Sequence, residues 1–163
     1  MTTTTPITCL FVDIGGVLLT NGWDHHARRR AVAKFDLDWD EMEERQQMNV
    51  AIYEEGKLTL EDYLNRTVFY VDRPFTQDQF FEFMVAQTHP DREMLALVAG
   101  LKTQHGLRIV AVSNEARELN GYRIREFGLD RLVDCFISSC FVHTRKPDLN
   151  MFRLALDIAQ TPP

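Results

Sequence analysis

Four polar side chains in this sequence could together carry out displacement by a carboxylate. Asp13 could attack an electrophilic centre and form a covalent ester, which is how carboxylate nucleophiles act in catalysis. Ser113 and Asn114 could hold an oxygen of the group under attack, and the Lys146 ammonium could neutralise charge on the nucleophile and on the transition state. These residue types are also common at strand and helix ends for structural reasons alone. The chemistry therefore depends on whether the fold brings the four together.

Each of the four lies at or just after an apolar run with the character of a buried strand. The runs span 7–13, 107–112 and, with a weaker pattern, 135–138. Continuous apolar runs are typical of strands that are covered on both faces of a sheet. In open parallel sheets, ligands bind beyond the carboxyl ends of the strands. The four side chains are therefore expected to converge at that edge of one sheet.

The segments between these strands carry helical signals. Residues 14–106 contain four N-cap signals, at Asp24, Asp38, Thr59 and Thr76. Apolar residues over 94–101 then recur with the spacing of one amphipathic helix. Further helices are expected over 116–127, despite the turn signal Asn120-Gly121, and over 148–159. This alternation predicts an α/β fold, a Rossmann-like parallel sheet with right-handed crossovers and an inserted helical segment.

The composition limits the class of protein and of partner. The chain has 163 residues and a formal net charge of −6, and its longest basic block is Arg28–Arg30. Sequence-independent nucleic-acid binding needs a basic face, so nucleic acid is not expected as a partner. No apolar run reaches the roughly 18 residues that a membrane span needs, so no membrane partner is expected. The three cysteines form no CxxC pair, which predicts reduced thiols in a cytoplasmic protein.

Three short motifs resemble those of the haloacid dehalogenase superfamily. The sequence DIGGVL at 13–18 resembles the first motif, which reads Asp-x-Asp-Gly-x in most phosphatase members. Val112-Ser113-Asn114 resembles the second motif, and Arg145-Lys146-Pro147-Asp148 resembles the third. The likeness covers nearly the whole chain and implies a hydrolase.

The resemblance also implies a domain organisation and a class of substrate. The α/β core would comprise 1–20 and 90–163, and 21–89 would be similar to the type 1 helical cap that closes over the site in this superfamily. A small phosphorylated or halogenated molecule would bind between core and cap, with Asp13 as its nucleophile. The resemblance leaves the oligomeric state and the identity of the substrate open.

One departure from the superfamily pattern lies in the first motif. Gly15 stands where phosphatase members carry a second aspartate, which protonates the leaving group and then activates water. Glycine can do neither, so turnover should be slow unless another group acts in its place. Gly15 can still offer its backbone carbonyl. The resemblance therefore implies Asp13 and the Gly15 carbonyl as the protein ligands of a magnesium ion.

A second departure concerns the end of the chain. The superfamily's fourth motif, an acidic pair that helps to bind magnesium, is absent before Pro163, and we interpret this as a truncation. Magnesium is therefore expected for the full-length protein and should bind weakly or not at all to these residues. The first strand should also lie at an edge of the sheet, with backbone groups unpaired on one side.

The sequence is compatible with three functions. The first is hydrolysis of a small organic phosphate ester through an aspartyl-phosphate at Asp13. The second is a 2-haloacid dehalogenase, which uses the same aspartate without a metal and usually carries a tyrosine where this chain has Gly15. The third is non-catalytic: a remnant, or a phosphoacceptor domain similar to a response-regulator receiver, although receivers carry the phosphorylated aspartate on the third strand. We expect the first function.

Overall fold

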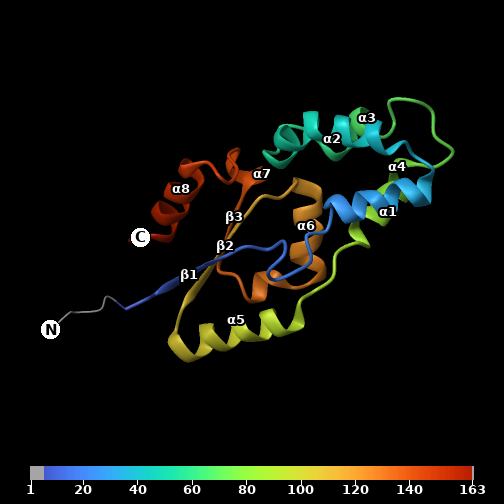
Figure 1. Cartoon of the computed structure of the whole chain (residues 1–163). Coiled ribbons are helices and arrows are strands. Elements are labelled where there is room, and N and C mark those ends of the chain that lie inside the picture. The colour runs from blue at the N-terminus through green and yellow to red at the C-terminus, as the bar shows by residue number, and fades with distance from the viewer. Residues whose placement is uncertain (1–5, 163) are drawn as a thin grey trace.

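A parallel sheet forms the centre of the protein. The computed structural model describes residues 6–162. Within them, β1 (Cys9–Val12), β2 (Arg108–Ser113) and β3 (Cys135–Ser138) form a three-stranded sheet in the order β1-β2-β3 (Figure 1). Both strand pairs are parallel, so all three carboxyl ends lie at one edge. The α/β fold predicted from the sequence is confirmed.

Helices cover both faces of this sheet. On one face, Ile109 and Ala111 of β2 pack with Val98 of α5 (Arg92–His105). On the other face, Val110 and Val112 pack with residues of α8 (Leu149–Ala159). Alternate residues of β2 therefore face opposite layers, as the pleat of a strand requires. Figure 1 shows α5 and α8 on opposite sides of the sheet.

A helical segment lies between β1 and α5 in the sequence and has a core of its own. It consists of α1 (His25–Phe35), α2 (Trp39–Glu54), α3 (Leu60–Thr67) and α4 (Gln77–Val85). Its buried cluster includes Tyr63, Phe80 and Met84, together with Leu119 of α6 (Arg117–Glu126) and the N-cap residue of that helix, Ala116. This segment therefore packs against α6 beyond the carboxyl ends of the strands (Figure 1).

The predicted N-caps form where the sequence places them. The side chains of Asp24 and Asp38 accept hydrogen bonds of 2.8 Å from the backbone N–H groups of the third helical residues. Thr59 and Thr76 head complete capping boxes. Each cap satisfies a backbone donor that would otherwise have no partner in the first turn. These local signals account for the starts of α1, α2, α3 and α4.

Helix α6 continues through Asn120-Gly121, where the sequence contains a turn signal. Asn120 is fully buried, and the neighbouring Leu119 contributes to the core of the helical segment. A glycine inside a helix costs only about 1 kcal/mol relative to alanine, so burial of this face outweighs the local preference. Two short elements were not predicted because they are too short for a periodic pattern: the 3-10 helix Leu129–Arg131 and α7 (Ser139–Val142).

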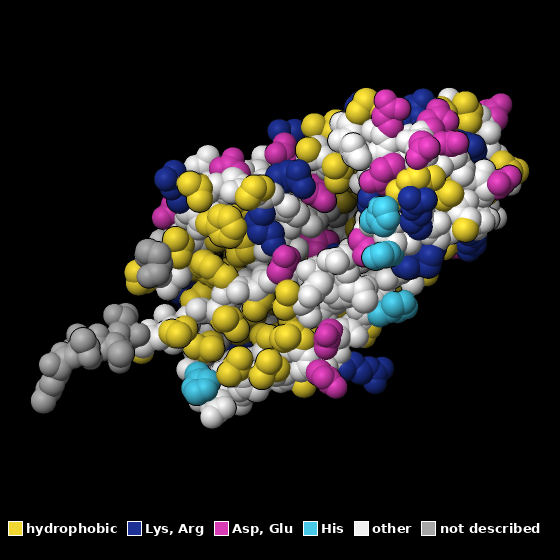
Figure 2. All heavy atoms as spheres, viewed as in Figure 1, with side chains coloured by type: hydrophobic (Ala, Val, Ile, Leu, Met, Phe, Trp, Pro, Cys, Tyr) yellow, Lys and Arg dark blue, Asp and Glu magenta, His cyan; other side chains and the backbone are white. Residues whose placement is uncertain are grey.

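β1 is an edge strand, as expected, and pairs only with β2 within the described range. Ile7, just before it, is 76% exposed. Figure 2 shows hydrophobic side chains gathered beside β1, between α5 and α8. Residues 1–5 and 163, which the sequence assigns to the core, lie outside the described part of the chain. Over 6–162, no helix has the length and apolar character of a membrane span.

Candidate active site

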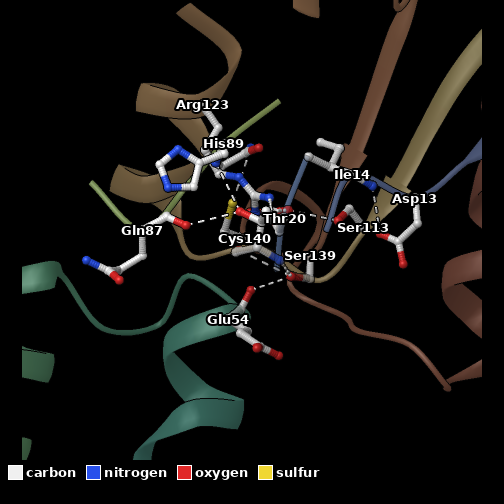
Figure 3. Close-up of polar contacts among 12 residues, drawn as sticks. Asp13, Ile14, Thr20, Glu54, Gln87, His89, Ser113, Arg123, Ser139 and Cys140 are labelled. Carbon is white, nitrogen blue, oxygen red and sulfur yellow. Dashed lines mark hydrogen bonds and ion pairs between the residues drawn. The ribbon is translucent and has the colours of Figure 1, made fainter. Parts of the chain in front are cut away.

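The end of β1 and the loop that follows α7 bring Asp13 and Lys146 into direct contact. Lys146 Nζ donates to Asp13 Oδ2 at 2.5 Å, and the backbone N–H of Ile14 donates to Asp13 Oδ1 at 2.8 Å (Figure 3 shows the Ile14 contact). The side chains remain 36% exposed for Asp13 and 23% exposed for Lys146. Both carboxylate oxygens are therefore oriented by donors, yet the group is still open to solvent. This is a suitable arrangement for a nucleophile.

Asn114 holds the backbone of Lys146. Its side-chain Nδ2 donates to the Lys146 carbonyl at 3.0 Å, and its Oδ1 accepts from the Lys146 N–H at 2.7 Å. The amide is thus engaged at both ends with one residue of the loop after β3. The structure brings Asn114 to the expected edge of the sheet, where these bonds fix the loop that carries Lys146.

Ser113 leads to a second pair of charges that the motifs did not indicate. Its Oγ donates to Glu115 Oε1 at 2.9 Å. Arg123 Nη1 donates to both carboxylate oxygens of Glu115 at 2.7 Å. Its Nη2 donates to the Thr20 carbonyl at 2.6 Å (Figure 3 labels Arg123 and Thr20). The pair is almost fully buried, with side chains 3% and 5% exposed. Burial raises the pKa of Glu115, and the Arg123 guanidinium opposes this shift.

A cleft of about 360 Å³ lies between these strand ends and the helical segment. Asp13, Gly15, Ser113, Asn114 and Lys146 all contribute to its lining from the side of the sheet. From the helical segment it is lined by Trp23, Asp24, Arg28, Gln46, Val50, Tyr53 and Glu54. The sequence-predicted residues therefore share one cleft, and side chains that the sequence did not single out form its opposite wall.

The C-terminal end of α2 is docked on α7 and on the loop that follows it. Ser139 Oγ donates to the Glu54 carbonyl at 2.6 Å (Figure 3), and Arg145 Nη2 lies 2.7 Å from Glu54 Oε2. Gly56 follows with φ +66, and a Cβ at this position would lie 2.4 Å from the Cys140 carbonyl. Only glycine permits this approach without a backbone shift. Burial raises the pKa of Glu54, while Arg145, Arg28 and Lys146 oppose the shift.

The space beside Gly15 limits what could replace the missing aspartate. A Cβ built on Gly15 would lie 3.3 Å from Asn21 Oδ1 and 3.9 Å from Arg123 Nη2. The neighbouring Gly16 has φ +73, which glycine adopts without strain. The surroundings of Gly15 are therefore an amide and a cation, and no acidic group lies among these nearest atoms.

The donors available to a magnesium ion here are few. The Asp13 carboxylate and the Gly15 carbonyl are the oxygens that the first motif offers, and no hydrogen bond within 6–162 ends on that carbonyl. Over the same range there is no cluster of three or more His, Cys, Asp or Glu residues that could hold a metal ion. Protein magnesium sites commonly use one or two carboxylates together with water and substrate phosphates. The described residues alone do not complete such a site.

Solved structures with the same fold include enzymes of two kinds. A HAD family enzyme from Bacteroides thetaiotaomicron matches with a TM-score of 0.81 and 16% identity, over 98% of this chain and 81% of that chain. Its complex with magnesium and inorganic phosphate matches with a TM-score of 0.76 and 16% identity, over 95% and 80% of the chains. An L-2-haloacid dehalogenase from Xanthobacter autotrophicus with covalently bound chloropropionic acid matches at 0.64 and 14%, over 96% and 66%.

These identities are low, so the structural matches establish the fold and leave the activity undetermined. A comparison with curated proteins found no match. The sequence profile of the haloacid dehalogenase-like hydrolases, in contrast, matches residues 7–163, which is nearly the whole chain. The chain therefore belongs to the haloacid dehalogenase-like hydrolase family.

Proposed function

We propose that this protein hydrolyses a small organic phosphate ester through a covalent intermediate at Asp13. The observation that carries the proposal is the Asp13 carboxylate itself. It is held at a strand end by the Ile14 N–H at 2.8 Å and by Lys146 Nζ at 2.5 Å, and it lines a cleft. A carboxylate held in place by donors at both of its oxygens can present an oxygen to phosphorus as a nucleophile.

The other predicted residues take supporting roles in this proposal. Lys146 neutralises charge on Asp13 and on the transferring phosphoryl group. Ser113 turns from Glu115 toward a phosphoryl oxygen when the ester binds. Asn114 acts as a positioning residue, because both ends of its amide hold the backbone of Lys146. The free N–H groups in the first turn of α6, which follows Asn114, add a further anion-binding element.

The division into core and cap is part of the same proposal. Residues 1–20 and 90–163 would supply the chemistry, and 21–89 would act as a type 1 cap that contacts the leaving group. The cleft supports this division, because its walls come from both parts. Charged and aromatic cap side chains such as Arg28 and Trp23 would then select the substrate.

Magnesium would bind only weakly to the described residues. Asp13 and the Gly15 carbonyl would be its ligands, and the described residues offer too few donors for tight binding. The magnesium and phosphate complex of the Bacteroides relative supports phosphate as the group transferred, although that relative is distant. Every step proposed for this chain therefore rests on its own side chains.

Dehalogenation of a 2-haloacid is a second candidate because Gly15 provides no carboxylate beside Asp13. A haloacid carries one negative charge, and its halide leaves without a proton, so neither a metal nor an acid is needed. The same fold holds a covalently bound chloropropionic acid in the Xanthobacter enzyme. Phosphate release and halide release should be assayed in parallel, with and without a chelator. Halide release that survives the chelator, without phosphate release, would favour dehalogenation.

The proposal itself is tested with Asp13→Asn. The variant should lose roughly 10⁴-fold or more in kcat/KM for a phosphate ester, as expected when a nucleophile is removed. Asp36→Asn is the matched control, because Asp36 is exposed at the end of α1 and has φ 52, a conformation that asparagine tolerates. Full activity in Asp13→Asn would refute the assignment, as would an equal loss in both variants.

A further inference from the structure

An ester with an alkoxide leaving group needs a proton donor in the cleft. Expulsion of an unprotonated alkoxide is slow, and a positioned acid typically accelerates such a step about 10²–10⁴-fold. Lys146 cannot serve, because its ammonium is engaged with Asp13 at 2.5 Å. Besides Asp13, the carboxyl groups that line the cleft are Asp24, Glu54 and Glu115.

Two of these three carboxyl groups are committed to other bonds. Asp24 caps α1 and accepts the Ala27 N–H at 2.8 Å, so its carboxylate is held at the start of that helix. Glu115 binds Arg123 with both oxygens at 2.7 Å, and only 3% of its side chain is exposed. Neither group can hand a proton to a ligand in the cleft without breaking these bonds. Glu54 is the remaining carboxyl group.

Glu54 has the freedom that the other two lack. It is the last residue of α2, and its side chain keeps 23% of its surface exposed where it lines the cleft. Its Oε2 faces Arg145 Nη2 at 2.7 Å, while its Oε1 makes no hydrogen bond to any residue from 6 to 162. The Ser139 contact to the Glu54 carbonyl fixes the backbone (Figure 3). The carboxyl group is thus paired with a cation at its buried Oε2, and Oε1 is not committed to any hydrogen bond among residues 6–162.

We propose that Glu54 is the general acid and base of this site, acting from the helical segment opposite Asp13. The proposal rests on the proposed function, since it assigns the proton transfers of that reaction. Burial of Glu54 raises its pKa and is consistent with a protonated form. The charged groups that face it are Arg145, Arg28 and Lys146, all cations, which stabilise the carboxylate formed after transfer.

The two steps balance without any further reactant. In the first, an Asp13 oxygen bonds to phosphorus, the bond from phosphorus to the ester oxygen breaks, and that oxygen takes the proton of Glu54. In the second, water attacks phosphorus, one of its protons returns to Glu54, and the bond from phosphorus to Asp13 breaks. The products are the alcohol and inorganic phosphate, and both side chains are restored.

Glu54→Gln tests this assignment through the dependence on the leaving group. For an alkyl phosphate, kcat/KM should fall about 10²–10⁴-fold. For p-nitrophenyl phosphate, whose leaving group needs no proton, kcat/KM should stay within a few-fold of the parent. The same variant should release one equivalent of nitrophenol in a burst and then turn over slowly, because water is no longer activated.

Glu55→Gln is the matched control, because Glu55 is the adjacent residue, pairs with Lys57 and does not line the cleft. It should behave as the parent with both esters. If Glu54→Gln lost kcat/KM equally for both esters, or for neither, Glu54 would not be the acid. Asp13→Asn separates the two proposals: activity that depends on Asp13 but not on Glu54 would leave the proposed function intact and overturn this inference.

Arg145→Gln provides a second readout that a purely structural contact would not move. The acid form of Glu54 is required for the first step, so kcat/KM for the alkyl ester should fall as pH rises through the pKa of Glu54. Removal of the Arg145 cation raises that pKa, and the descending limb should move to higher pH. An unchanged limb in this variant would contradict the assignment.

Discussion

Two ion pairs lie beyond the carboxyl ends of the sheet strands, and they differ in the number of their contacts and in the exposure of their side chains. Asp13 and Lys146 meet through one contact and keep 36% and 23% of their side chains exposed. Glu115 and Arg123 meet through two contacts, bind Ser113 and the Thr20 carbonyl as well, and are 3% and 5% exposed. The first pair is open to a ligand, and the second has almost no free surface.

The difference indicates what each pair contributes. A buried, doubly hydrogen-bonded pair ties elements together, and removing one partner leaves an uncompensated charge. Arg123 joins α6 to Thr20, which lies between β1 and the helical segment. An exposed pair contributes little to stability but leaves its carboxylate reactive. We therefore expect variants of the two pairs to separate into effects on folding and effects on catalysis.

The largest expected effect on folding is in Arg123→Met. It leaves the Glu115 carboxylate buried without its partner, and the free energy of unfolding should fall by roughly 3–5 kcal/mol in urea titrations. The double variant Glu115→Met/Arg123→Met should recover much of this loss, because no charge is left buried. Arg45→Met, at an exposed pair 3.3 Å from Glu41, should cost less than about 1 kcal/mol. If Arg123→Met and Arg45→Met lost the same free energy of unfolding, the buried Glu115–Arg123 pair would contribute no more to stability than an exposed pair does.

Lys146→Met should impair catalysis and leave the stability of the fold nearly unchanged. The loss of a cation at the nucleophile should lower kcat/KM about 10²–10³-fold. The free energy of unfolding should change by less than about 1 kcal/mol. Lys102→Met is its control, because Lys102 forms a similarly exposed pair with Asp134 at 2.7 Å and does not line the cleft. Strong destabilisation in Lys146→Met, or full activity, would contradict the comparison.

The dependence of stability on pH should distinguish the buried pair further. The pKa of Glu115 is raised in the folded state above its ordinary value of 4.5. At pH values above 4.5, the folded protein therefore binds more protons at this group than the unfolded chain does. The contribution of this group to stability should therefore be full below that pH and be lost as pH rises through the folded-state pKa. In urea titrations at a series of pH values, the free energy of unfolding should decline less over this window in Glu115→Gln than in the parent protein. An identical decline in both proteins would mean that the raised pKa of Glu115 does not govern it.

The smallest effect that we expect is the heat released when magnesium binds. With one carboxylate and one carbonyl among the described donors, half-saturation in calorimetry should lie above roughly 1 mM. Asp13→Asn should abolish the remaining heat of binding, whereas Asp24→Asn should not, because Asp24 is held in its helix cap. Tight binding to the 163-residue chain would show that its own residues supply further ligands.

Local sequence features predicted the framework well. Asp24 and Thr76 act within a few residues of their own positions, and the three apolar runs correspond to β1, β2 and β3. The first strand is shorter than the run at 7–13, because pairing with β2 begins at Cys9. The parallel order then brings Asp13 and Lys146 together, since a parallel sheet aligns the ends of its strands.

The contacts that sequence reasoning missed join residues from distant elements. Glu54 and Arg145 meet only because α2 docks beyond β3, and Arg123 reaches Thr20 from the second turn of α6. No local spacing specifies such pairs, and alternation of apolar residues carries no information about which charges face each other. A raised pKa of Glu54 likewise depends on burial that only the packed structure creates.

The central claim is that Asp13 becomes covalently esterified during turnover. Rapid acid quenching of the protein with p-nitrophenyl phosphate, followed by peptide mass spectrometry, measures this directly. We predict a phosphoryl group on the peptide that contains Asp13, located at that residue by fragmentation, absent from Asp13→Asn and present in Asp36→Asn. A phosphoryl group on any other residue, or steady phosphate release with no adduct even in the slowly turning Glu54→Gln variant, would contradict the account.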